Sequence, residues 1–220
     1  TRAACAEAFA AVAGRPLVRL PQLAGRAESE IFFDALALNG VDVRADGTAE
    51  RLLQPFTAAL AAAMQARAGD LARQGRLLPG AAEALAAAAK LDGTVQTVLT
   101  GSSKANAELK LRAFGLDRLV DLGIGGYGDE AYPKGTLLTV ARQRAADKHR
   151  VSFAEGATVY VADSPRDMEA ARIAGVAALA VASGRASAAE LRAAGAAAAL
   201  EDLTDTARVV SLITELTGPR

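Results

Sequence analysis

The sequence predicts an α/β protein with a doubly wound, Rossmann-like parallel-sheet core and a separate small all-helical domain. From residue 94 onward, short strand patterns alternate with helical patterns of about 10–15 residues, which is typical of βαβ units and a parallel sheet. No convincing strand pattern precedes residue 94. We therefore expect a helical domain over residues 1–77 and an α/β core over residues 78–220.

The N-terminal region carries helical signals only. Apolar periodicity predicts helices over residues 3–13, 28–38 and 49–73. Gly14 and Asn39-Gly40 stand at the ends of the first two, as helix-stop residues do. The turn residues Pro79-Gly80 then mark the domain boundary.

The C-terminal region alternates between the two kinds of element. Strands are predicted over residues 95–99, 119–124, 159–161, 177–182 and 197–200. Helices are predicted over residues 81–90, 103–114, 135–149, 165–174, 190–194 and 205–216. Because chemistry in parallel sheets gathers at the carboxyl ends of the strands, the residues just after each strand are the candidates for a site.

Composition limits the possible partners. The chain is 51% hydrophobic, enough for a real core, and its formal net charge is zero. The basic residues are scattered, and no apolar run reaches the roughly 20 residues of a membrane-spanning helix, so we expect neither nucleic acid nor membrane as a partner. A lone cysteine, Cys5, favours a reducing compartment, so the expected location is the cytoplasm, with a monomer as the default state.

The segment VYVADSPRDMEAARIAGV, residues 159–176, places two aspartates where a strand meets a helix. Ser164 suits a helix N-cap, Pro165 suits the first helical position, and Asp167 completes a capping box. Those structural roles leave Asp163 unexplained, a carboxylate directly after the strand.

A second polar strand end is Thr100-Gly101-Ser102-Ser103, which runs straight into a predicted helix. Free backbone N–H groups at a helix start, a glycine and nearby hydroxyls together suit a phosphate. Helix capping accounts for one of the serines but leaves Thr100 unexplained.

Residues 123–128 read GIGGYG, which has the letters of a dinucleotide-binding fingerprint. A dinucleotide site needs a helix to begin at once, whereas Asp129-Glu130 and then Pro133 follow here. The stretch is interpreted as a flexible loop, and a nicotinamide-dependent enzyme is the least favoured alternative.

Lys134 opens the predicted helix after that loop. A lone lysine is most often a solvated surface residue. Its place at the same sheet edge as the other polar strand ends makes it a candidate for the site.

Together these segments resemble the haloacid dehalogenase-like hydrolase superfamily, specifically its phosphoglycolate-phosphatase-like branch with a helical cap. Residues 98–102, VLTGS, are similar to the second motif of that family, and residues 159–176 are similar to the fourth. Residues 1–77 resemble the helical cap, and Gly25-Arg26 resembles a cap loop that can face the substrate.

The resemblance implies a role for each matching residue. Thr100 would be the phosphate-binding hydroxyl, helped by the neighbouring Gly101 and Ser102. Asp163 would coordinate Mg²⁺, and Asp167 would bind the metal or its waters while also capping the helix.

Two further roles follow from the same resemblance. Lys134 would be the third-motif lysine, although the family often writes that lysine before a proline and here Pro133 precedes it. Arg26 would contact the substrate, or be ion-paired within the cap.

One family motif is missing from these residues. The first motif, Asp-x-Asp-Gly-Thr, supplies the nucleophile, and no Asp-x-Asp occurs in the 220 residues. We expect the intact polypeptide to carry an apolar strand and this motif within about twenty residues upstream of Thr1. A catalytically degenerate phosphate-binding or regulatory relative is the competing interpretation.

The implied activity is Mg²⁺-dependent hydrolysis of a small phosphorylated metabolite through an aspartyl phosphate. Dehalogenation needs no metal and would not need Asp163. Phosphonate cleavage in this fold needs a cap lysine, and residues 1–89 contain none. A phosphosugar mutase is a less favoured alternative.

Overall fold

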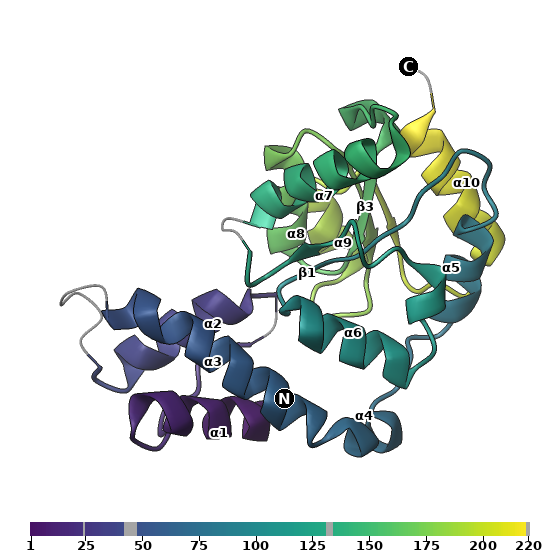
Figure 1. The fold of residues 1–220 in the computed structure, drawn as a ribbon. Coiled ribbons are helices and arrows are strands. Elements are labelled where there is room, and N and C mark those ends of the chain that lie inside the picture. The colour runs from purple at the N-terminus through teal and green to yellow at the C-terminus, as the bar shows by residue number, and fades with distance from the viewer. Residues whose placement is uncertain (24, 42–47, 131–133, 219–220) are drawn as a thin grey trace. The chain divides into compact units, whose positions relative to one another are not determined.

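The computed structural model describes residues 1–23, 25–41, 48–130 and 134–218. In chain order its helices and strands are α1 (Arg2–Ala13), α2 (Glu28–Leu38), α3 (Thr48–Gln65), α4 (Ala68–Gln74), α5 (Ala81–Ala88), β1 (Leu99–Thr100), α6 (Lys104–Ala113), η1 (Asp117–Leu119), β2 (Gly126–Tyr127), α7 (Lys134–His149), η2 (Glu155–Ala157), β3 (Val159–Ala162), α8 (Pro165–Ile173), β4 (Ala177–Val181), α9 (Ala188–Ala193), β5 (Ala198–Leu200) and α10 (Thr206–Thr217) (Figure 1).

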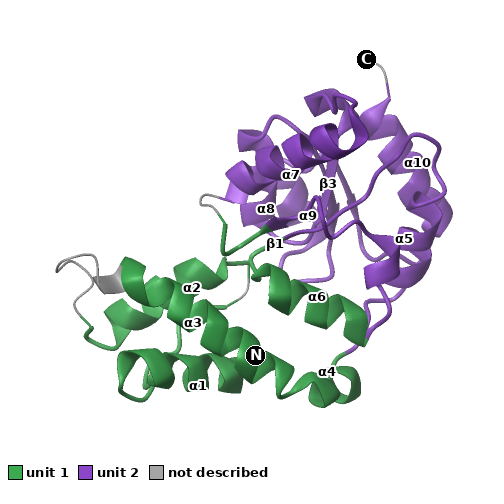
Figure 2. Cartoon of the chain, viewed as in Figure 1, with its two compact units in different colours: residues 1–75, 100–113, 127–130 green, residues 76–99, 114–126, 131–220 purple. Residues whose placement is uncertain are grey.

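Contacts divide the chain into two compact units (Figure 2). Unit 1 holds residues 1–75, 100–113 and 127–130, and unit 2 holds residues 76–99, 114–126 and 131–220. The expected boundary at residues 77–78 lies near the end of the first segment. However, α6, which the sequence placed in the core domain, groups with unit 1. The division into a cap domain and a core domain stays a prediction.

Unit 1 is built around an apolar core supplied by its helices. The buried members of this core are Ala4, Cys5, Ala8, Phe9, Ile31, Phe32, Ala35, Leu36, Phe56, Leu60, Ala63 and Met64. Many are alanines, so the helices pack closely, and the rings of Phe32 and Phe56 stack with centroids 4.5 Å apart. Gly14 ends α1 at a φ of 65°, as expected of a helix-terminating glycine.

The helical span predicted over residues 49–73 is helical but consists of two helices, α3 and α4, with a break between them. At the break the Arg67 amide bonds the carbonyl of Met64, at 3.0 Å, which is a tighter turn than the helical spacing. The Arg67 guanidinium also donates to the carbonyl of Ala63 at 2.8 Å. Apolar residues continue at helical spacing across this break, so the sequence pattern gave no sign that the helix ends there.

Unit 2 confirms the α/β class. The strands β3, β4 and β5 form a parallel sheet in that order, with Val161 opposite Leu179 and Leu179 opposite Ala198. The helices α7 and α8 lie on one side of this sheet, and α5 and α10 lie on the other (Figure 1). Parallel pairing brings the carboxyl ends of the three strands to one edge.

The predicted strands over residues 95–99 and 119–124 are much shorter and shifted in the structure. They appear as β1 and β2, which pair in a separate two-stranded sheet. The backbones of the two predicted strands are still hydrogen-bonded to each other, because Asp121 N donates to Gln96 O at 2.8 Å and Gly126 N donates to Val98 O at 3.0 Å.

None of the helices in the described ranges is long and apolar enough to cross a bilayer.

Candidate active site

The loop between β3 and α8 follows the local rules of helix initiation. Ser164 is the N-cap, with an extended backbone at φ −133° and ψ 152°, and its hydroxyl oxygen accepts from the Asp167 amide at 3.3 Å. Pro165 occupies the first helical position. The predicted N-cap at Ser164 is confirmed, but the Asp167 carboxylate accepts from the Ser164 hydroxyl and does not complete the predicted capping box. Asp163 lies at the carboxyl end of β3.

Asp167 is a buried carboxylate surrounded by donors. The residue is 3% exposed. Its Oδ1 accepts from the Tyr160 hydroxyl at 2.8 Å and from Lys134 Nζ at 2.5 Å. Its Oδ2 accepts from the Ser164 hydroxyl at 2.5 Å. These three donors, one of which is the Lys134 cation, offset the cost of keeping this charge away from water.

Lys134 reaches Asp167 because α7 packs very closely on α8. A Cβ on Gly135 would lie 2.8 Å from Ile173 Cγ2 and 3.1 Å from the carbonyl oxygen of Ala170. Only glycine permits this approach, and Lys134 is the residue immediately before it. Lys134 is therefore not a solvated surface residue: its side chain is 19% exposed.

Asp163 lies in the field of this ion pair. Partial burial raises the pKa of the Asp163 carboxyl, the negative charge of Asp167 raises it further, and the Lys134 ammonium opposes both. A Cβ on Gly184, in the loop after β4, would lie 2.8 Å from Asp163 Oδ2. That glycine therefore leaves room for the carboxylate.

Tyr160 is a donor that the sequence analysis missed. Burial raises the pKa of its phenol, and so do the charges of Asp167 and Asp163, so the hydroxyl stays protonated and donates. Its position in a predicted strand is visible in the sequence. Its reach to a side chain seven residues later is not.

The carboxylates of Asp163 and Asp167 supply some, but not all, of the ligands that a hard cation needs. Carboxylate oxygens are ligands that Mg²⁺ prefers, and two adjacent negative charges favour one. Asp167 already accepts three hydrogen bonds, so its remaining capacity suits a metal-bound water, while Asp163 is the better direct ligand. Across the described ranges, no group of three or more His, Cys, Asp or Glu side chains is placed to hold a metal.

The predicted phosphate loop lies at the start of α6, in unit 1. The Thr100 hydroxyl oxygen accepts from the Ser102 amide at 3.1 Å, which forms a local turn. The Ser102 amide was expected to face a phosphate, but it is used inside the loop. The hydroxyl of Ser102 in turn accepts from Lys110 Nζ at 2.7 Å.

Gly101 was expected to allow a ligand to approach the backbone, but the chain itself makes that approach. A Cβ on Gly101 would lie 2.1 Å from the carbonyl oxygen of Arg26, and a Cβ on Gly128 would lie 2.0 Å from the carbonyl oxygen of Gly101. The amide of Glu28 donates to that same Gly101 oxygen at 2.7 Å. The loop is thus held by packed backbone on both sides.

This packing also corrects the interpretation of GIGGYG. Residues 124–128 are buried rather than forming a flexible loop, and Tyr127 is 1% exposed. Gly126 permits contact with Leu137, whose carbonyl oxygen would be 2.7 Å from an added Cβ, and Gly128 permits contact with Gly101. These glycines allow the backbone to pack closely on other segments, and the sequence alone does not indicate which segments those are.

Arg26 is ion-paired with Asp34 through Nη1, as one of the two sequence-based expectations had it. Its Nε is buried and has no hydrogen-bond partner within the part of the chain that the structure describes. Arg26 therefore keeps one donor for another group. Its backbone, packed on Gly101, places it beside the predicted phosphate loop within unit 1.

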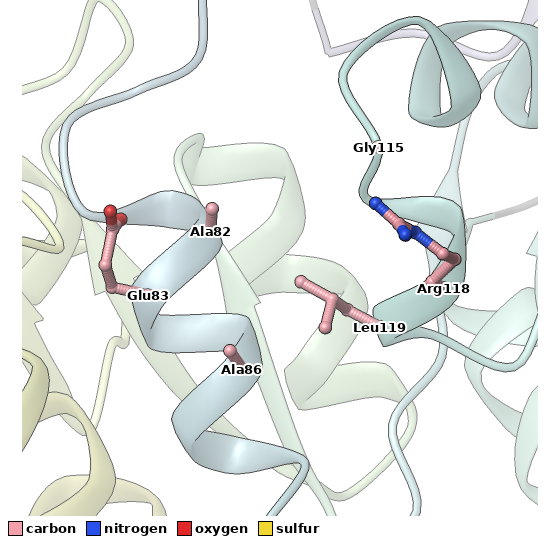
Figure 3. A pocket seen from close by; sticks show the side chains of 6 residues that line it. All are labelled: Ala82, Glu83, Ala86, Gly115, Arg118 and Leu119. Carbon is pink, nitrogen blue, oxygen red and sulfur yellow. The ribbon is translucent and has the colours of Figure 1, made fainter.

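The structure thus brings the predicted residues together in two sets. Asp163, Asp167 and Lys134 gather in unit 2, and Arg26 gathers with the Thr100–Ser102 loop in unit 1. The sequence analysis missed three polar residues beside that loop: Glu28, Asn106 and Lys110. A shallow hollow between α5 and η1 contains none of these residues (Figure 3). Its lining is Ala82, Glu83, Ala86, Gly115, Arg118 and Leu119.

Comparison with known families decides the relationship. The family model described as haloacid dehalogenase-like hydrolase matches residues 2–172 of the 220. The chain belongs to this family. The predicted resemblance to this superfamily is thereby confirmed, and the branch, the motif assignments and the roles of individual residues stay predictions. No curated protein gives a significant match to the chain.

Several solved structures share the fold of this chain. A hydrolase from Pseudomonas syringae is 22% identical, with a TM-score of 0.64 over 96% of this chain and 90% of that one. A family hydrolase from Deinococcus radiodurans with bound phosphate and sodium is 21% identical, with a TM-score of 0.52 over 98% and 90%. CbbY from Rhodobacter sphaeroides, in complex with xylulose-(1,5)bisphosphate, is 20% identical, with a TM-score of 0.56 over 93% and 87%.

Proposed function

We propose that this haloacid dehalogenase-like hydrolase is a Mg²⁺-dependent phosphatase that hydrolyses a small phosphate monoester through an aspartyl phosphate. The observation that carries the proposal is the set at the end of β3, where Lys134 binds Asp167 and both charges act on Asp163. The solved relatives with bound phosphate and with a sugar bisphosphate support the substrate class by likeness of fold.

Asp163 would hold the metal directly, and Asp167 would hold it directly or through a water. When bound, the ion supplies positive charge that lets a phosphate dianion enter beside carboxylates. Without it, two like charges about 4 Å apart repel by roughly 4 kcal/mol at an effective dielectric constant of 20. Lys134 adds a second positive charge that Asp167 keeps in place.

The hydroxyls of the loop support an anionic substrate. A hydroxyl has one proton to donate and two lone pairs that accept. In Thr100 and Ser102 a neighbouring N–H group already occupies a lone pair, so each O–H proton is available to an external acceptor. We propose that these two protons bind the oxygens of the transferring phosphoryl group, as preorganised donors.

Arg26 would recognise a second polar or anionic part of the substrate through its unpartnered Nε. The opposing account is that Arg26 serves only its ion pair with Asp34. These two accounts predict different effects of Arg26 and Asp34 substitutions on KM.

The attacking carboxylate needs an Asp-x-Asp motif, and none occurs in these 220 residues. A second candidate function, a phosphate-binding or regulatory relative without turnover, would not need this carboxylate. A phosphosugar mutase would share the metal and the loop but would return an isomeric phosphate instead of free phosphate.

One assay separates these functions. The full-length protein is incubated with a panel of small phosphate monoesters, with Mg²⁺ or with EDTA, and released phosphate is measured. The proposal expects release that depends on Mg²⁺ for at least one ester. Phosphate binding without release would favour the regulatory relative, and isomerised ester would favour the mutase.

A further inference from the structure

Lys110 lies on α6 and donates from Nζ to the hydroxyl oxygen of Ser102 at 2.7 Å. No motif suggested this lysine, and the proposed chemistry does not use it. The contact is partly buried and joins two residues eight apart in sequence. Lys110 is therefore aimed inward at the phosphate loop instead of outward at solvent.

The direction of this hydrogen bond is fixed by chemistry. An ammonium group has three donors and no acceptor, so Lys110 can only donate and the Ser102 oxygen can only accept. Ser102 thereby keeps its own proton for a different acceptor. Without the lysine, the same hydroxyl could rotate and donate its proton to a neighbouring acceptor instead.

Buried hydrogen bonds of Glu28 hold both α6, which carries Lys110, and the loop that carries Ser102. Glu28 is 6% exposed, and its carboxylate accepts from Asn106 Nδ2 at 3.0 Å, which links α2 to α6. The Glu28 amide binds the carbonyl of Gly101 in the loop itself. Burial lowers the pKa of Lys110, while the Glu28 charge acts against that change and favours the ammonium form.

Some buried polar atoms of this hydrogen-bond network lack a hydrogen-bond partner among the described residues, which is unusual for a network with a purely structural role. Ser103 is 3% exposed and Asn106 is 1% exposed, yet Ser103 Oγ and Asn106 Oδ1 have no hydrogen-bond partner in the described part of the chain. The same holds for the buried Nε of Arg26, whose backbone packs on Gly101. Buried polar atoms are normally paired, so this cluster is suited to a polar ligand or to the water that a ligand replaces.

We propose that Lys110 is a positioning residue that holds the Ser102 hydroxyl as a proton donor to a bound phosphate group. Lys110 acts through Ser102 and makes no contact with the substrate. The inference rests on the proposed function only for the identity of the anion. Phosphate binding tests it independently of turnover.

The experiment titrates inorganic phosphate into the full-length protein in the presence of Mg²⁺, by calorimetry, and records the melting temperature of every variant. The variants are Lys110→Met, Lys110→Arg, Ser102→Ala and the double variant Lys110→Met with Ser102→Ala. Arg112→Met is the matched control, because it removes one cation from the same helix at a side chain that is 64% exposed.

We expect Lys110→Met to weaken phosphate binding about tenfold, as for a lost hydrogen bond to a charged group, and Lys110→Arg to restore part of it. Arg112→Met should leave it unchanged. The double variant should bind phosphate as Ser102→Ala does, because Lys110 has nothing to position once the hydroxyl is gone. If Lys110→Met does not fold, Lys110→Gln keeps a donor without the charge and should bind at an intermediate strength.

Three results would overturn the inference: unchanged phosphate affinity in the Lys110 variants, fully additive effects in the double variant, or no phosphate binding by the wild type. Failure of the proposed phosphatase looks different. Phosphate binding would then depend on Lys110 as expected, but no ester would be hydrolysed.

Discussion

Lys134 and Asp167, 33 residues apart in sequence, are joined by a hydrogen-bonded ion pair of 2.5 Å between Nζ and Oδ1. The pair ties the first residue of α7 to the first turn of α8, and it places a positive charge near Asp163. Both side chains are largely buried, at 19% and 5% exposed. Its removal should therefore affect both stability and the site.

We predict that Lys134→Met lowers the free energy of unfolding by about 2–3 kcal/mol, because it leaves the buried Asp167 charge without its cation. Urea denaturation at neutral pH measures this loss. Lys148→Met is the control, since the Lys148–Asp121 pair has the same 2.5 Å length but side chains that are 53% and 24% exposed. The control should lose less than about 1 kcal/mol, and equal losses would contradict the account.

Substitution of Gly184 tests whether the position of the Asp163 carboxylate matters for metal binding. An added Cβ would lie 2.8 Å from Asp163 Oδ2, so Gly184→Ala must push that carboxylate aside. We predict weaker Mg²⁺ binding in calorimetry with little change in melting temperature. Gly156→Ala, whose Cβ would meet nothing within 4 Å, should keep wild-type Mg²⁺ affinity. Equal Mg²⁺ affinity in both variants would show that the position of Asp163 does not matter to the metal.

Arg26 distinguishes substrate recognition from a local ion pair. If the Nε group binds substrate, Arg26→Met should raise KM about tenfold or more while kcat changes little. Asp34→Asn removes the same ion pair but keeps the guanidinium, so it should leave KM near the wild-type value. A matching rise of KM in both variants would assign Arg26 to the ion pair alone.

The burial of Cys5 predicts that its thiol is unreactive in the folded protein and that its contribution to stability depends on pH. Burial raises the pKa of this thiol from its ordinary value of 9.0, and the Glu28 charge adds to the effect. Since the folded state keeps the proton that the unfolded chain loses, the thiol's contribution to stability is complete below pH 9.0 and declines as pH rises above it.

Two measurements check this behaviour. A thiol reagent should react with Cys5 only after unfolding, because the residue is 2% exposed. The difference in unfolding free energy between wild type and Cys5→Ala, about 1 kcal/mol at neutral pH, should shrink at alkaline pH. A constant difference across that range would contradict the pKa shift.

Local chemistry in the sequence predicted part of the site. Ser164 and Pro165 form the helix start that their types favour, because capping is decided within a few residues. The α/β class also followed from alternating patterns. The bounds of α2, Glu28–Leu38, agree with the prediction because an amphipathic stretch and its stop signal coincide there.

Features that depend on distant partners could not be predicted. Gly126 and Gly128 pack against Leu137 and Gly101, and only the tertiary structure reveals those contacts. The bond from Lys110 to Ser102 was missed for a related reason. A lysine on a short helix has the same sequence signature whether it faces solvent or a loop.

The most direct test of the central claim is the effect of Asp163→Asn on Mg²⁺ binding and on Mg²⁺-dependent phosphate release by the full-length protein. Asp147→Asn, on the exposed face of α7, is the matched control. The account predicts that Asp163→Asn abolishes Mg²⁺ binding and phosphate release at an unchanged melting temperature, while Asp147→Asn retains both. Wild-type Mg²⁺ affinity in Asp163→Asn would contradict it.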